Sequence, residues 1–119
     1  MPRKLINSIK YAKAGAEHAL RTQRNIWIHI FVGLIILMVA LWLRVSLTEM
    51  AILAVTISIV IMAEMFNTAI EELVNILSPG HRIEAALAKN VAAAAVLTTV
   101  VGAVVVGCVI FIPRLIKLI

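Results

Sequence analysis

The residues best suited to chemistry form a polar stripe in an otherwise apolar part of the chain. The stripe consists of four residues at three- and four-residue intervals: Glu64, Asn67, Glu71 and Asn75. A helix places residues at these intervals on one face, and this helix begins inside an apolar run long enough to enter a membrane. A carboxylate at that depth costs roughly 2.5–3.5 kcal/mol and is rarely retained without a task. We therefore expect the chemistry of the chain at this stripe.

The two carboxylates of the stripe suit different roles. Glu64 and Glu71 lie about 10 Å apart along a helix axis, which is too far for them to share one proton. One can act as a general base while the other binds a hard cation such as Mg²⁺. Lys89, just before the next apolar run, can neutralise phosphate oxygens. A base, a metal ligand and a cationic clamp are the parts that phosphoryl transfer needs.

Each of these residues also has a simpler interpretation. Glu64 can be a structural carboxylate that is hydrogen-bonded to a neighbouring helix, and Glu71 and Glu72 can form a solvated face. Lys89 can extend to the lipid headgroups. The sequence contains no glycine-rich phosphate loop, no metal-finger spacing and no serine–histidine arrangement. A nucleotide would therefore need a site specific to this fold.

The histidines give weaker signals. We expect His29 to pack between helices and His81 to be a solvated residue in a turn.

The composition is that of a membrane protein. Of 119 residues, 63% are hydrophobic and the mean hydropathy is +1.08, whereas soluble domains are usually 45–50% apolar. The net charge of +5 does not indicate nucleic-acid binding, because no soluble basic domain is present to bind it. Anionic headgroups and nucleotide phosphates suit these cations better. We expect one integral-membrane domain over residues 1–119, without a cleavable signal peptide.

Hydropathy and turn residues predict an all-α membrane protein. Residues 3–24 combine apolar positions at helical spacing with basic residues elsewhere, which is typical of an amphipathic helix lying in the membrane interface. The alternative is a basic leader that only fixes topology. Three membrane-spanning helices follow, over residues 26–44, 48–77 and 88–112, the second with a cytoplasmic extension. Ser78, Pro79 and Gly80 break the chain after the second span, and Pro113 is expected to end the third.

Positive charge predicts the orientation of these spans. Eight Lys and Arg residues fall on one side of a three-span arrangement and three on the other. The three are Arg44, Arg114 and Lys117. This asymmetry places the N-terminus and the 76–90 loop in the cytoplasm, together with the polar stripe. The small residues of 92–95 offer a surface for close helix–helix contact.

Three segments together resemble a known family. Residues 64–71 read E-x-x-N-T-A-I-E, Ser78-Pro79 follows in a turn, and residues 88–97 read A-K-N-V-A-A-x-A-V-L. Upstream, residues 22–29 read T-Q-R-N-x-x-I-H. Over roughly residues 5–112 the chain resembles the bacterial integral-membrane lipid kinases, which include the small diacylglycerol kinases and the undecaprenol kinases.

The resemblance implies an ATP- and Mg²⁺-dependent kinase of the bacterial cytoplasmic membrane, assembled as a homotrimer. It would transfer the γ-phosphoryl group of ATP to the hydroxyl of undecaprenol or diacylglycerol at the cytoplasmic interface. Glu64 would be the catalytic base, supported by Asn67 and Thr68. The remaining roles implied are metal binding by Glu71 and Gln23, and nucleotide phosphate binding by Lys89, Asn90 and Asn75.

Three positions depart from the family pattern. Gln23 stands where a Glu is usual, and Asn75 and Asn90 each stand where an Asp is usual. An amide oxygen can still bind a cation, but without the charge it binds more weakly. One alternative function is therefore a weakened or inactive family member that acts as a structural or regulatory membrane trimer. Another is a small transporter or proton-conducting oligomer that uses Glu64 and has no ATP requirement.

Overall fold

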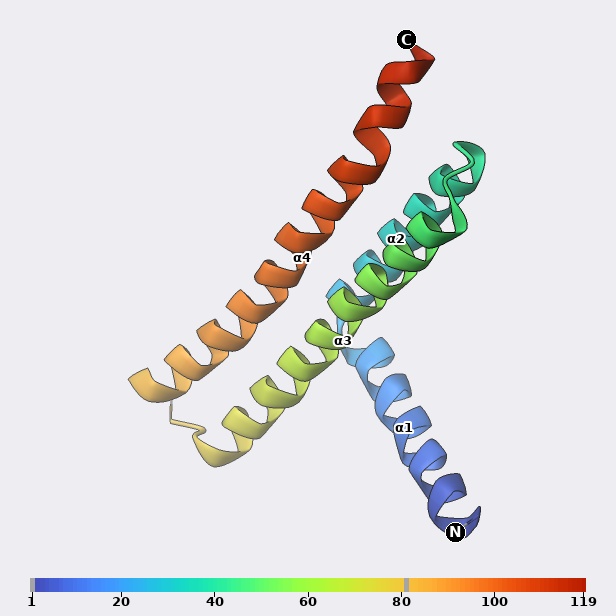
Figure 1. Cartoon of the computed structure of the whole chain (residues 1–119). Coiled ribbons are helices and arrows are strands. Elements are labelled where there is room, and N and C mark those ends of the chain that lie inside the picture. The colour runs from blue at the N-terminus through green and yellow to red at the C-terminus, as the bar shows by residue number, and fades with distance from the viewer. Residues whose placement is uncertain (1, 81) are drawn as a thin grey trace.

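The computed structural model describes residues 2–80 and 82–119, so His81 lies outside the described residues. These ranges form four α-helices: α1 (Pro2–Thr22), α2 (Arg24–Trp42), α3 (Leu47–Leu77) and α4 (Ile83–Leu118) (Figure 1). Helices α2, α3 and α4 are each long and apolar enough to cross a membrane. The expected all-helical chain with three candidate membrane spans is confirmed.

Helix α3 is the central element of the three spans. It contacts both α2 and α4 along much of its length. A small core of fully buried apolar residues joins the three helices through Ala40, Leu53 and Ile110. Most other large apolar side chains are exposed in the single chain. In lipid such side chains need no protein cover, because the surrounding hydrocarbon is as apolar as they are.

The bounds of all three spans differ from the expected ones, and α2 begins and ends two residues before the expected range of 26–44. A capping box between Ser46 and Glu49 begins α3, because each side chain accepts a hydrogen bond from an orphan N–H of the other. Helix α4 extends beyond 88–112 at both ends and continues through Pro113, so the prediction that Pro113 ends this segment is wrong. A proline removes one backbone hydrogen bond and often kinks a helix without ending it.

The amphipathic helix α1 stands apart from the spans. It leaves the start of α2 at a steep angle, and most of it lies clear of the other helices (Figure 1). Only Ala19 is buried in it. The helix ends at Thr22, two residues before the expected bound, because Gln23 takes an extended conformation with φ −117° and ψ 109°. An exposed apolar face at an angle to the spans is what an interfacial helix requires.

Two polar contacts fix the direction of α1. The indole Nε1 of Trp27 donates a hydrogen bond to the carbonyl oxygen of Leu20, at 2.6 Å. The Nε2 atom of His18 lies 2.6 Å from Oε1 of Glu72 on α3. The interfacial helix is therefore joined to α2 at its end and to the polar half of α3 at its side.

Helices α2 and α3 approach each other closely at Gly33. A Cβ atom built on Gly33 would lie 2.7 Å from Cγ2 of Ile57, an atom attached directly to the branched Cβ and therefore unable to move far. We expect Gly33→Ala to destabilise the protein by about 1–3 kcal/mol through overpacking. Thermal unfolding in detergent measures this. Gly102→Ala is the matched control, because no atom lies within 4 Å of its added Cβ; an equal loss there would contradict the packing explanation.

Candidate functional site

Three polar side chains on α3 are buried within the single chain. The exposed fractions of Glu64, Asn67 and Thr68 are 3%, 8% and 4%. The hydroxyl of Thr68 donates to the carbonyl oxygen of Glu64, at 2.9 Å, which satisfies it within the helix. Burial of a carboxylate among apolar helices costs free energy. Glu64 is therefore buried among the helices, and the Thr68 hydroxyl is hydrogen-bonded within α3.

A histidine side chain on α2 lies beside Glu64. The Nε2 atom of His29 lies 3.8 Å from Oε2 of Glu64, and His29 is about one quarter exposed. His29 packs between helices, as expected, but its position beside Glu64 was not foreseen. No sequence signal marks the pair, because it depends on the register between two helices. A histidine at this distance suits the positioning of a carboxylate or the acceptance of its proton.

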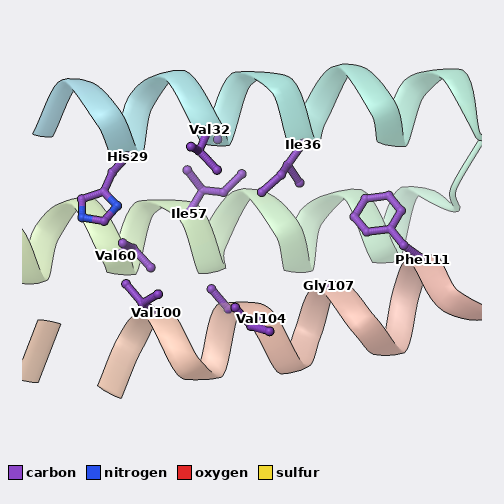
Figure 2. Close-up of a pocket in the computed structure, with 11 residues that line it drawn as sticks. His29, Val32, Ile36, Ile57, Val60, Val100, Val104, Gly107 and Phe111 are labelled. Atoms are coloured by element: carbon purple, nitrogen blue, oxygen red, sulfur yellow. The ribbon is translucent and has the colours of Figure 1, made fainter. Parts of the chain in front are cut away.

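An apolar groove begins at His29. Its volume is about 240 Å³, and it runs between α2, α3 and α4. His29, Val32 and Ile36 line it from α2, and Phe111 lies near its other end (Figure 2). Almost all of its wall is hydrocarbon, whereas His29 brings a polar atom next to Glu64. The groove suits an aliphatic chain, and His29 links its lining to the carboxylate of Glu64.

The next turn of the stripe carries the candidate metal ligand. The amide nitrogen of Asn67 donates to Oε1 of Glu71 at 3.1 Å, and the Oδ1 atom of Asn67 is buried without a partner. Glu71 is half-buried, and this bond leaves its second oxygen free. Mg²⁺ is usually held by one or two carboxylates together with substrate phosphates. Glu71, oriented by Asn67, fits that pattern.

The described residues do not form a metal site made of protein alone. They contain no cluster of three or more His, Cys, Asp or Glu side chains able to hold an ion. Gln23 lies half-buried between α1 and α2, and no hydrogen bond joins its side chain to another described residue. The donors present therefore suit an ion that completes its coordination with phosphate oxygens and water.

A second pocket lies where α3 turns into α4. It has a volume of about 330 Å³ and is lined by Asn75, Ser78, Arg82, Lys89 and neighbouring small residues. The Nζ atom of Lys89 donates to Oδ1 of Asn75, at 2.5 Å. Asn75 is neutral, so it orients Lys89 without cancelling its charge. Two of the three residues expected to bind nucleotide phosphate, Lys89 and Asn75, therefore line one pocket, whereas Asn90 is exposed outside it.

Sequence reasoning missed two residues of this pocket. Arg82 adds a second positive charge, and the Oγ atom of Ser78 is buried without a partner. Helix α4 begins at Ile83, directly after Arg82, and the N-terminus of a helix attracts anions. A turn that contains Ser-Pro followed by a basic residue at a helix start was the available signal. Two cations, a hydroxyl and a helix N-terminus give this pocket the character of a phosphate site.

The fold and site define a helical membrane protein with three candidate spans, a buried carboxylate and a basic pocket at the same end. A family model described as prokaryotic diacylglycerol kinase matches residues 10–111. The chain belongs to the prokaryotic diacylglycerol kinase family, a family of membrane lipid kinases. Membership of a kinase family implies ATP as the phosphoryl donor.

Two relatives show the range of lipid acceptors. A diacylglycerol kinase from Synechocystis is 37% identical over 115 residues, which are 96% of this chain and 66% of that protein. An undecaprenol kinase from Bacillus subtilis is 30% identical over 112 residues, which are 94% of this chain and 91% of that protein. The chain thus spans just under two thirds of the length of the first relative and most of the second.

Proposed function

We propose that this protein transfers the γ-phosphoryl group of ATP to the hydroxyl of a membrane lipid, either undecaprenol or diacylglycerol. The observation that carries the proposal is the buried Glu64, 3.8 Å from the His29 side chain that lines the apolar groove. A lipid with its chain along this groove brings its hydroxyl to Glu64 while the chain stays in hydrocarbon. Glu64 then accepts the hydroxyl proton as the oxygen attacks the γ-phosphorus.

The other residues of the site hold the donor. Asn67 orients Glu71, and Glu71 with Gln23 is proposed to bind Mg²⁺ carried by the nucleotide phosphates. When bound, this ion supplies charge neutralisation at those phosphates. Phosphate oxygens of the nucleotide are bound from the other side by Lys89 and Arg82. Asn75 and Asn90 lie beside Lys89 and contribute to the same binding. Together these side chains place the nucleotide between the turn after α3 and the buried base.

The setting of the site is part of the same proposal. The charge asymmetry of the loops supports a bacterial cytoplasmic membrane with the N-terminus and the 76–90 loop in the cytoplasm, where ATP is present. Many apolar side chains and the small residues of α4 remain exposed in the single chain. The family resemblance implies a homotrimer, and the exposed small residues of α4 support close helix contacts between its subunits.

The experiment is phosphoryl transfer from radiolabelled Mg²⁺-ATP by the purified protein, with diacylglycerol and undecaprenol offered in parallel. Label in either lipid that is lost in Glu64→Gln supports the kinase and selects its acceptor. Absence of label in both lipids, from protein shown to be folded and oligomeric, would contradict the proposal.

The second candidate is a weakened or inactive family member that acts as a structural membrane trimer. It is favoured by the amides at Gln23, Asn75 and Asn90, which remove three negative charges that the family pattern usually has. Retention of Glu64, Glu71 and Lys89 in one region of the fold favours the enzyme instead. The same transfer experiment separates the two, because the structural candidate predicts a folded oligomer without label.

Lys89 provides a prediction specific to the nucleotide. Loss of a hydrogen bond to a charged group costs about 1.5–3 kcal/mol, so we expect Lys89→Gln to raise the KM for ATP by about 10- to 150-fold. The KM for the lipid should change little, because Lys89 lies away from the apolar groove. Steady-state kinetics with each substrate varied measure this. Lys10→Gln, which removes an exposed charge on α1, is the control, and an equal effect there would point to net charge instead.

A further inference from the structure

A third pocket lies at the opposite end of the spans from the candidate active site. It has a volume of about 440 Å³ and is lined by Arg44, Arg114 and Lys117 together with Trp42, Leu43 and Leu118. Arg44 follows α2, whereas Arg114 and Lys117 lie one turn apart on α4. Its wall therefore carries three cations and no acidic residue. These are also the only cations that the described residues place at this end of the spans.

The backbone at Arg44 shows that this cation stands at an unfavourable position. The N–H of Arg44 donates to the carbonyl oxygen of Leu41, and the N–H of Val45 donates to that of Ala40. This pair of bonds closes α2 with a Schellman motif, in which glycine is the usual residue at the position of Arg44. Arg44 has a φ of 57°, and it is the one non-glycine residue with positive φ among the described residues. Backbone strain of this kind points to a functional requirement for the side chain.

Arg114, the second cation, is held in place by an ion pair, and one of its N–H donors has no hydrogen-bond partner. A guanidinium nitrogen of Arg114 forms an ion pair with Glu49, the residue that also caps α3. The Nε atom of Arg114 is buried without a hydrogen-bond partner. Buried donors are almost always paired in folded proteins. The orientation of Arg114 is thus fixed by Glu49, while its Nε donor has no acceptor among the described residues.

We propose that this pocket binds the phosphate group of an anionic glycerophospholipid, with the acyl chains of that lipid lying against the spans. Arg44 and Lys117, which form no ion pair with a described residue, supply the positive charge for a phosphodiester, whereas the charge of Arg114 is shared with Glu49. The apolar lining supplies a wall for hydrocarbon, and Trp42 is a residue typical of the membrane–water interface. A free phosphate would gain nothing from Trp42, Leu43 and Leu118, so the lining favours the lipid over the soluble anion.

Trp42 also provides a reporter located at the pocket. The chain contains two tryptophans, so in a Trp27→Phe background the fluorescence comes from Trp42 alone. The full-length protein is reconstituted into vesicles of phosphatidylcholine with increasing brominated phosphatidylglycerol, whose bromine quenches tryptophan in contact with its acyl chains. Brominated phosphatidylcholine gives the reference, and inorganic phosphate is added as a competitor in a separate series.

We expect Trp42 to be quenched at lower fractions of phosphatidylglycerol than of phosphatidylcholine. Each basic residue near a membrane surface contributes about 1 kcal/mol of attraction to anionic lipid, so Arg44→Gly and Lys117→Gln should each reduce this preference about five-fold. Glycine accepts positive φ without strain, so Arg44→Gly keeps the fold. Lys10→Gln removes one charge at the other end of the molecule and should leave the preference unchanged.

Three results would overturn the proposal. The first is an unchanged preference for phosphatidylglycerol when Arg44→Gly and Lys117→Gln are combined. The second is an equal loss of preference in Lys10→Gln, which would assign the effect to net charge. The third is displacement of the brominated lipid by inorganic phosphate, which would make the pocket a site for a soluble anion. The control is the fluorescence of Trp27 in a Trp42→Phe background, because Trp27 lies at the opposite end of the spans. Its quenching should not change in Arg44→Gly or Lys117→Gln.

Discussion

Replacement of Glu64 by Gln is expected to lower kcat for lipid phosphorylation by about 10²–10⁴, the usual contribution of a general base. The amide keeps the shape of the side chain but cannot accept the hydroxyl proton. The KM for ATP should change little, because the basic pocket that we assign to the nucleotide is formed by other residues at the turn after α3. Initial rates with each substrate varied in turn give both values.

The thermal stability of the Glu64→Gln protein distinguishes a catalytic role of Glu64 from a structural one. A buried carboxylate is costly in apolar surroundings, and its removal often stabilises a protein while function is lost. We expect the thermal unfolding temperature of Glu64→Gln to equal or exceed that of the wild type. Glu72→Gln is the matched control on the same helix, because Glu72 is exposed and contacts His18 rather than the groove. A Glu64→Gln protein that unfolds earlier and keeps its kcat would assign Glu64 a structural role.

The fold was predictable because the membrane leaves few alternatives. Backbone groups in hydrocarbon must be satisfied within a helix, so three long apolar runs specify three helices. The ends of the helices were less predictable. Helix α1 ends at Thr22, two residues before the expected bound, and α4 continues through Pro113 to Leu118. Local hydrogen bonds and neighbouring helices decide where a helix ends.

The alignment of the stripe on one helix face was also predictable, whereas its burial and its partners were not. Glu64 and Asn67 are buried, Glu71 is half-buried and Asn75 is exposed. The approach of His29 to Glu64 and that of His18 to Glu72 depend on how far one helix is shifted along another. A single sequence contains no measure of that shift. The close contact at Gly33 was missed for the same reason, although it helps to set the register.

The metal ligands provide the second large expected effect. Glu71 is the one carboxylate of the proposed Mg²⁺ set, and Asn67 orients it through a 3.1 Å hydrogen bond. Loss of a residue that orients a metal ligand typically lowers metal affinity by roughly 10–100-fold. Loss of the charge of the ligand itself should lower the Mg²⁺ affinity by about 100-fold. We therefore expect Glu71→Gln to raise the Mg²⁺ concentration for half-maximal rate by about 100-fold.

Gln23→Glu tests the same site in the opposite direction. Gln23 has no side-chain partner among the described residues, so a carboxylate there adds a negative charge without breaking a contact. If Gln23 belongs to the metal set, the added charge should lower the half-maximal Mg²⁺ concentration by about ten-fold, since Mg²⁺ binds carboxylate more strongly than amide oxygen. Asn7→Asp adds the same charge to the exposed part of α1 and should have no effect. An unchanged Mg²⁺ requirement in Gln23→Glu would remove Gln23 from the site and leave Glu71 as its one protein ligand.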